Sequence, residues 1–269
     1  LVGRSGDELA DVVRRLAANG GPAAAATADV RDPEAIAAAV DDVERRLGPI
    51  DVLVNNAGVL GPIGPLWELD TDAWWTTIDV NLRGILLCAH LVLPGMVARR
   101  HGRIINVTSQ AGAHRWPLVS AYSVSKAAVV KFSENLAHET GRHGVSVFSV
   151  HPGLLPIGLS ATMAAHAPTS RYEDHIRSWA LTELDEGRGA TPEQAVELIL
   201  RLAAGHADSL SGRHLSVHDD LDALLSRIDE VRNRDLYVMR PERLTAPTPV
   251  PDDHATESLQ HTSRPRSLS

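Results

Sequence analysis

Short apolar stretches alternate with longer amphipathic ones along most of the chain. The stretches at 50–54, 103–107 and 145–150 are mostly apolar, which is typical of strands that are buried on both faces of a sheet. Between them, apolar residues recur at helical spacing over roughly 72–100 and 121–141. Because parallel strands need helical crossovers, this alternation predicts an α/β fold whose parallel sheet has helices on both faces.

The N-terminal residues predict two further helices. Ser5 and Glu8 have the spacing of a capping box, and apolar residues recur at helical spacing from there to Gly20. Asp32 followed by Pro33 begins the second helix. The alanine-rich stretch between the two helices predicts a weak strand, and the opening Leu-Val has the character of a strand end. We therefore expect a sheet that lacks its first strand and first helix.

The C-terminal third divides into three parts. Residues 154–190 mix small, polar and aromatic types without periodicity, which predicts a mobile loop that serves a site. A helix after Thr191 and a short strand at 212–217 complete the sheet. Residues 241–269 are rich in proline and serine and poor in apolar side chains, so we expect a disordered tail there and a single domain over 1–240.

Composition limits the partners and the compartment. The 34 acidic residues outnumber the 26 basic ones, and the net charge of −8 disfavours nucleic acid and membrane surfaces as ligands. The apolar run around the single Cys88 is interrupted by His90 and Pro94 and is shorter than a bilayer requires. One cysteine excludes an internal disulfide and offers no metal-ligand spacing. We expect a cytoplasmic protein with a small-molecule ligand.

The stretch YSVSK places Tyr122 and Lys126 one helical turn apart on one face. An ammonium beside a phenol favours the phenolate and lowers its pKa, so Tyr122 becomes a candidate for proton exchange. Ser109 follows the strand at 103–107, where open α/β sheets bind ligands. Asn81 lies inside the long helix, where it either bends the helix or holds a water molecule. Taken singly, each has an ordinary structural explanation as a surface, capping or kink residue.

Considered together and in order, the motifs favour a functional interpretation over these structural ones. Asn55-Asn56-Ala57-Gly58, Asn81, Ser109, Tyr122 and Lys126 follow one another at spacings that resemble the short-chain dehydrogenase/reductase family, over roughly residues 1–220. The resemblance implies a Rossmann-type doubly wound parallel sheet, a nicotinamide cofactor, and interconversion of a carbonyl and a secondary alcohol by hydride transfer. It also implies a homodimer or homotetramer.

The resemblance implies a role for each matching residue. Tyr122 would be the general acid/base, Ser109 would orient the substrate carbonyl, Lys126 would assist the phenol and bind the nicotinamide ribose, and Asn81 would hold the water of a proton relay. Trp116, between Ser109 and Tyr122, is the candidate for the substrate pocket, whereas the other tryptophans are expected in the core. The implied cofactor contacts are Asp29, Val30, Asn55, Ala57, Gly58, Tyr122, Lys126, Pro152 and Gly153.

Arg4 points to the type of nicotinamide cofactor. It follows the position at which the family's second strand ends near the adenosine ribose, and the first acidic residue after it is Asp7. Since a guanidinium suits a 2′-phosphate whereas an acidic side chain suits the free hydroxyl, we expect NADP in preference to NAD.

Two features depart from the family pattern. The glycine-rich turn that receives the pyrophosphate is absent from this sequence, and Ile157 stands where the family often has a threonine. We favour a fragment of a longer enzyme, with a degenerate, non-catalytic binding or scaffolding subunit as the alternative. A cofactor-independent elimination enzyme is disfavoured because Lys126 is retained. His214, His218, Asp219 and Asp220 are interpreted as a polar edge, so no metal site is expected.

Overall fold

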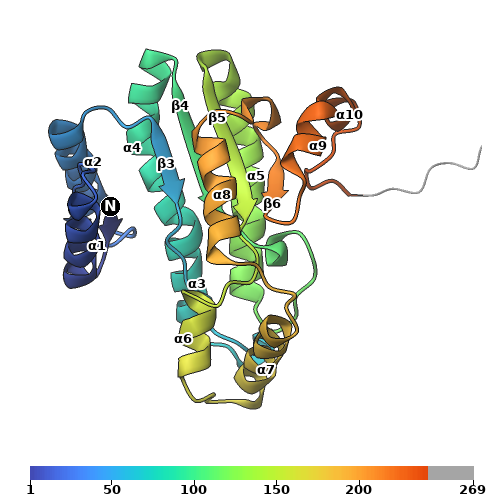
Figure 1. Cartoon of the computed structure of the whole chain (residues 1–269). Coiled ribbons are helices and arrows are strands. Elements are labelled where there is room, and N and C mark those ends of the chain that lie inside the picture. The colour runs from blue at the N-terminus through green and yellow to red at the C-terminus, as the bar shows by residue number, and fades with distance from the viewer. Residues whose placement is uncertain (242–269) are drawn as a thin grey trace, which may run out of the picture. The chain divides into compact units, whose positions relative to one another are not determined.

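The computed structural model describes residues 1–241, and Leu1–Met239 form one compact unit. Its main sheet has four parallel strands in the order β3-β4-β5-β6 (Figure 1). These strands are β3 (Val52–Asn55), β4 (Gly102–Val107), β5 (Val145–His151) and β6 (His214–Ser216). The predicted tail falls, from residue 242 onward, outside the described residues.

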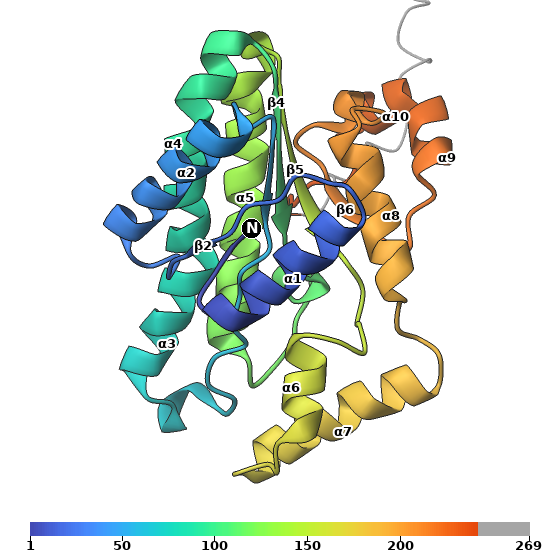
Figure 2. The same ribbon diagram turned by 60° about the vertical axis from the view of Figure 1, so that its left-hand side comes forward.

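Helices cover both faces of this sheet, as predicted. On one face, α4 (Gly84–Arg99) and α5 (Ser120–Thr140) enclose a core with the β4 and β5 side chains Ile104 and Val147. On the other face, α8 (Pro192–Ala203) packs against Ile105, Phe148 and Val150 (Figures 1 and 2). The predicted doubly wound parallel α/β fold is therefore confirmed.

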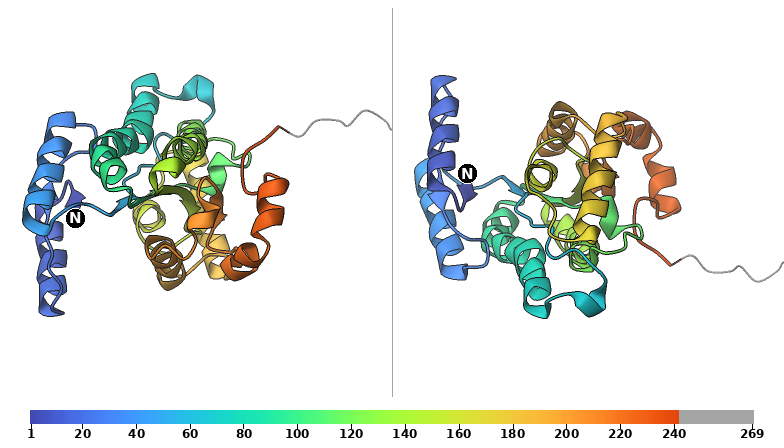
Figure 3. Two further views of the ribbon diagram at one scale, coloured as in Figure 1. Left: turned by 90° about the horizontal axis from the view of Figure 1, so that it is seen from above. Right: turned by 90° about the horizontal axis from the view of Figure 1, so that it is seen from below.

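A separate two-stranded parallel sheet forms the N-terminal flank. It pairs β1 (Val2–Gly3) with β2 (Ala26–Thr27), and α1 (Gly6–Ala18) and α2 (Pro33–Leu47) lie beside it at one edge of the main sheet (Figure 3). Ser5 precedes α1 as expected, but its hydroxyl makes no capping hydrogen bond, so the predicted capping box is wrong. Asp32 does cap α2, accepting a hydrogen bond from the Ala35 backbone N–H at 3.0 Å.

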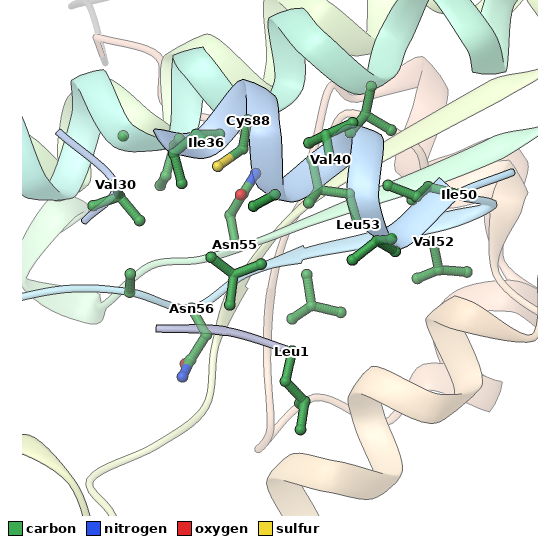
Figure 4. Close-up of a pocket in the computed structure, with 18 of the residues that line it drawn as sticks. Leu1, Val30, Ile36, Val40, Ile50, Val52, Leu53, Asn55, Asn56 and Cys88 are labelled. Carbon is green, nitrogen blue, oxygen red and sulfur yellow. The ribbon is translucent and has the colours of Figure 1, made fainter. Parts of the chain in front are cut away.

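An apolar cavity of about 600 Å³ lies between the two sheets (Figure 4). Within residues 1–241, β1 and β3 each have a strand partner on one side only, and residues of both strands line the cavity. Val54 of β3 is 40% exposed in consequence, although we predicted this strand to be buried on both faces. The gap corresponds to the position in which we expected the sheet to lack a strand.

The long apolar helix is continuous from Thr71 to Arg99, but it is not regular. After α3 (Thr71–Ile78), a π-helical turn at Asp79–Arg83 leads into α4. By length and composition this is the one segment of residues 1–241 that qualifies as a membrane span, so our argument that the apolar run is too short was wrong. The core helix of a soluble fold meets the same criteria, and α4 buries Ile85, Ala89 and Met96 within the protein.

Residues 154–190 are not the irregular loop that we predicted. They contain α6 (Leu159–Ala165) and α7 (Arg171–Asp185), which lie beyond the carboxyl ends of the strands (Figures 1 and 2). Ser170 caps α7 by accepting a hydrogen bond from the Glu173 backbone N–H at 3.1 Å. The two ends of the segment meet, because the Ala190 N–H donates to the Leu154 carbonyl at 2.9 Å. We call residues 154–190 the helical lid.

The remaining helical elements of residues 1–241 are short. They are η1 (Leu66–Glu68), η3 (Gln110–Gly112), η4 (Gly141–His143), η5 (Asp208–Leu210), α9 (Leu221–Ser226) and α10 (Ile228–Asn233).

Candidate active site

The structure brings Ser109, Tyr122 and Lys126 together at the carboxyl end of the main sheet. Ser109 follows β4 and caps η3, where its hydroxyl accepts a hydrogen bond from the Ala111 N–H at 3.2 Å and lies close enough to the Tyr122 phenol to lower the pKa of that group. Lys126 lies one turn further along α5, with its Nζ 5.6 Å from the centroid of the Tyr122 ring. The Lys126 ammonium also donates to the Val107 carbonyl at 2.9 Å, which holds the side chain against the end of β4. The three side chains therefore form one connected group.

Burial dominates the electrostatics of this group. It raises the pKa of the Tyr122 phenol, and the hydrogen bond from Ser109 offsets that effect only in part. The prediction that the neighbouring ammonium lowers this pKa is wrong in its net direction. Burial also lowers the pKa of Lys126 to about 8, so the ammonium is still predominantly charged at pH 7. Both side chains are tuned towards neutrality by the same apolar surroundings.

Asn81 occupies the π-helical turn and is fully buried. Its Oδ1 accepts a hydrogen bond from the Val59 N–H at 2.8 Å, and its Nδ2 donates to the Val59 carbonyl at 2.9 Å and to Ser125 Oγ at 3.0 Å. Such turns often mark functional sites because they redirect a side chain out of the regular helical pattern. Our sequence analysis missed Ser125, although its place in YSVSK next to Lys126 was a usable signal.

Gly58 lies where Asn81 and Lys126 converge. A methyl group at its Cα would lie 3.4 Å from Asn81 Oδ1 and 3.5 Å from Lys126 Nζ. Residue 58 therefore packs directly against both polar groups, and Asn81 Oδ1 already accepts the Val59 N–H there. Gly58 adjoins the two residues to which the resemblance assigns the ribose contact and the relay water.

Asn55, the last residue of β3, forms its side-chain hydrogen bond inside the protein. Asn55 Nδ2 donates to Asn106 Oδ1 at 2.9 Å, and Asn106 Nδ2 donates to Ser133 Oγ at 2.9 Å. This buried ladder joins β3, β4 and α5 and fixes the turn that carries Ala57 and Gly58. Val30, Asn55 and Ala57 line the cavity between the two sheets (Figure 4).

Three charged residues meet at the other end of the expected cofactor path. Asp29 accepts hydrogen bonds from the Arg31 backbone N–H at 2.9 Å and from its guanidinium, and these hold the pKa of Asp29 at about 2. Arg4 is close enough to add to this effect, yet it forms no ion pair within residues 1–241. Arg31, which we did not predict, gives this corner a second cation, and its position two residues after Asp29 was the signal.

The residues after β5 form a rigid corner. Gly153 has a φ of +83°, and a Cβ there would lie 2.4 Å from the Ala190 side chain. Pro152 and Gly153 are both partly buried, whereas Ile157 is 51% exposed. A side chain at Gly153 would push apart the base of the helical lid, so glycine is required here for both conformation and space.

A buried histidine pair lies behind Ser109. His214 Nδ1 is 3.3 Å from both Thr108 Oγ1 and Ser149 Oγ, while His151 ends β5. His151 Nδ1 and His214 Nε2 are buried without a hydrogen-bond partner within residues 1–241. Burial lowers the pKa of each histidine to about 4. In the described part of the chain, no group of three or more His, Cys, Asp or Glu side chains is arranged to hold a metal ion.

The tryptophans are distributed differently from the prediction. Trp116 does contact the site, because its ring lies 6.2 Å from that of Tyr122 in an edge-to-face arrangement. Trp67 and Trp75, expected in the core, are 85% and 62% exposed, since η1 and α3 present them to the outside. Trp179 of α7 is 40% exposed and packs against Trp116.

The protein is an α/β protein with a hydroxyl, a phenol and an ammonium at the carboxyl edge of its parallel sheet, where proteins of this class bind their ligands. The family model described as "short chain dehydrogenase" matches residues 1–167. Cis-4-hydroxycyclohexanecarboxylate dehydrogenase of Sinomonas cyclohexanicum is 34% identical over 81% of this chain and 84% of its own length. The chain belongs to the short-chain dehydrogenase family.

Two further comparisons give the extent of the likeness. Short chain dehydrogenase pigC of Monascus ruber is 35% identical over 76% of this chain, but the match spans only 62% of that relative. The crystal structure of a gluconate 5-dehydrogenase from Burkholderia cenocepacia with NADP and tartrate is similar with a TM-score of 0.71 and 28% identity, covering 83% of this chain and 84% of that one.

Proposed function

We propose that this protein interconverts a carbonyl and a secondary alcohol with a nicotinamide cofactor. The observation that carries the proposal is the connected group of Ser109, Tyr122 and Lys126 at the ligand-binding edge of the sheet. Membership of the short-chain dehydrogenase family supports it. When bound, the nicotinamide supplies or accepts the hydride.

Each residue of the group has a separate task. In the reducing direction Tyr122 donates its phenolic proton to the carbonyl oxygen, and in the oxidising direction it takes the proton of the hydroxyl group. Ser109 shares a hydrogen bond with the phenol and orients the same substrate oxygen. Lys126 stabilises the phenolate while it is charged, and it loses that charge as the pH rises through about 8.

The cofactor would extend from Lys126 towards Asp29. Gly58 adjoins Asn81 and Lys126, where the relay water and a ribose hydroxyl would lie, and the Gly153 corner supplies a wall for the nicotinamide ring. No glycine-rich strand-to-helix turn precedes β3 within residues 1–241 to receive the pyrophosphate. The described residues therefore fit the nicotinamide half of the cofactor, and a glycine-rich cradle for its phosphates is not among them.

NADP is the proposed cofactor. Arg4 is exposed, unpaired within residues 1–241, and close enough to Asp29 to lower its pKa. Arg31 is tied to Asp29 and neutralises it, so the local charge favours a 2′-phosphate over a free hydroxyl. The relatives include a gluconate 5-dehydrogenase crystallised with NADP and a Sphingomonas dehydrogenase named for NAD(+), so the proposal rests on the charges at this corner.

The setting of the enzyme is also a proposal. We propose a cytoplasmic protein whose catalytic domain spans residues 1–240 and which forms a homodimer or homotetramer. Exposed apolar side chains on the two long helices support self-association, since Leu86 of α4 and Val124 of α5 are 46% and 49% exposed. Size-exclusion chromatography with light scattering measures the oligomeric state directly.

Cofactor binding tests the function. NADPH and NADH are titrated into the protein, and binding is followed by the fluorescence of the reduced nicotinamide. We expect NADPH to bind more tightly than NADH, and Arg4→Ala to reduce that preference while Arg14→Ala on exposed α1 leaves it unchanged. If neither cofactor binds, the dehydrogenase proposal fails and the non-catalytic alternative is favoured.

A further inference from the structure

The Tyr122 ring is covered by apolar side chains from four separate segments. Tyr122 is 8% exposed and belongs to a buried cluster with Ala111, Val119 and Ile176 of the helical lid. The partly buried apolar residues packed on this cluster are Leu60, Ile63, Trp116 and Met163. A substrate that reaches the phenol must therefore contact or displace these apolar groups.

Two tryptophans extend this covering outwards. Trp116 meets Tyr122 edge to face at 6.2 Å, and Trp179 meets Trp116 at 5.2 Å with an angle of 61° between the rings. The three rings form a continuous aromatic wall from α5 to α7. Trp179 is 40% exposed, so the outer end of the wall opens to solvent and its inner end is the reactive phenol.

Two polar side chains of α7 tie this helix to neighbouring elements, although Arg177 Nε is buried without a partner within residues 1–241. Arg177 donates to the Ala164 carbonyl at 3.2 Å and so ties α7 to α6. The Tyr172 hydroxyl donates to Glu68 Oε1 at 3.3 Å, which ties α7 to η1. The side chains that cover the Tyr122 ring away from Lys126 are apolar and aromatic. A polar substrate group placed against the faces of the indole rings would lose its hydration without gaining a hydrogen-bond partner there.

We infer that Trp116 and Trp179 form the substrate subsite for an apolar, ring-bearing substituent of the carbonyl, and that Trp179 is a specificity-determining residue. This inference rests on the proposed function, because the substrate oxygen faces Tyr122 and Ser109. The preferred substrates are cyclic or aryl ketones and the matching alcohols, whose flat faces pack on the indole rings. Open-chain polyhydroxy ketones are poor ligands for such a wall.

The fold supplies the two tryptophans from different segments. The lid is closed at its base by the hydrogen bond between Ala190 and Leu154, next to Gly153 with its positive φ. Trp179 and Ile176 belong to the lid, whereas Trp116 belongs to the loop between η3 and α5. The two halves of the aromatic wall therefore come from separate segments of the chain, one of which, the lid, also covers Tyr122 through Ile176.

Ligand binding tests the subsite independently of turnover. Saturation-transfer NMR measures the dissociation constants of 1-indanone, a bicyclic aryl ketone, and of dihydroxyacetone, with and without NADPH. We expect 1-indanone to bind in preference to dihydroxyacetone. Trp179→Ala and Trp116→Ala should each weaken indanone binding by about fivefold, in line with the energy of one aromatic contact.

Two controls separate specificity from loss of structure. Trp179→Phe keeps a ring at the wall and should retain most of the affinity, while Trp67→Ala, at an 85% exposed residue, should change nothing. The inference is overturned if dihydroxyacetone binds as well as 1-indanone, or if both alanine variants at the wall bind 1-indanone normally. Preferred turnover of polyhydroxy ketones would reject the subsite while leaving the dehydrogenase function intact. If 1-indanone binds but no NADPH-dependent turnover is observed, the subsite is supported and the dehydrogenase function is rejected.

Discussion

Protonation of the buried histidine pair should destabilise the protein in mild acid. His151 ends β5 and His214 begins β6, and His214 is hydrogen bonded to Thr108, the neighbour of Ser109. Burial is the main cause of the lowered pKa in both, and repulsion from His214 and His218 adds to it at His151. In the unfolded chain these two histidines take up protons near pH 6.5, whereas in the folded chain they do so only near pH 4.

The sign and the size of the effect follow from this difference. Between these pH values the unfolded state holds more protons, so the stability is complete above pH 6.5 and is lost as the pH falls towards 4. From pH 7 to pH 5, each histidine removes about 2 kcal/mol of unfolding free energy, and two remove about 4 kcal/mol. That is a large share of the roughly 5–15 kcal/mol that stabilises a typical domain.

Urea unfolding followed by circular dichroism at pH 7, 6 and 5 measures this loss. The His214→Gln variant retains a side chain that bonds Thr108 and Ser149 but does not titrate, so its stability should fall about 2 kcal/mol less over the same interval. The matched control is His101→Gln, at an exposed residue, which should follow the parent protein. Equal pH dependence in His214→Gln and the parent would refute the reasoning.

Two further predictions concern the centre of the site. Gly58→Ala places a methyl group 3.5 Å from Lys126 Nζ and 3.4 Å from Asn81 Oδ1. We expect NADPH to bind more weakly in a fluorescence titration, while the thermal stability is nearly unchanged. Normal NADPH affinity would count against the proposed position of the ribose. Asn81→Ala leaves the Val59 N–H and carbonyl without their partner, which should lower the free energy of unfolding in urea by about 2 kcal/mol. Asn81→Asp should restore only the hydrogen bond from the Val59 N–H. An Asn81→Ala variant as stable as the parent would disprove the structural role of the π turn.

The fold could be predicted because its signals are local. Buried strands such as β4 and β5 are mostly apolar stretches, and caps such as Asp32 mark where helices begin. The helical lid was missed because α6 has only seven residues and α7 has a mostly polar sequence, in which the two buried side chains are Ile176 and Ala180. Tertiary stabilisation has no signature in the periodicity of a short segment.

The site was predictable in its members but not in its electrostatics. Ser109, Tyr122 and Lys126 could be selected from their order and spacing, since a helical turn separates the last two. The net direction of the phenol pKa depends on burial by Trp116, Ile176 and their neighbours, which come from distant parts of the sequence. Asp29 could likewise be chosen, but its pairing with Arg31 depends on the local backbone conformation.

The central claim is that the Tyr122 phenol exchanges the proton while the hydride is transferred. The most direct test compares Tyr122→Phe with Tyr237→Phe, which alters a phenol packed in the other core around β5 and α8. With NADPH and a cyclic ketone, Tyr122→Phe should lower kcat at least a hundredfold, in the usual range for loss of a general acid, while the affinity for NADPH and the activity of Tyr237→Phe stay near those of the parent. Turnover by Tyr122→Phe at the parent rate would contradict the account.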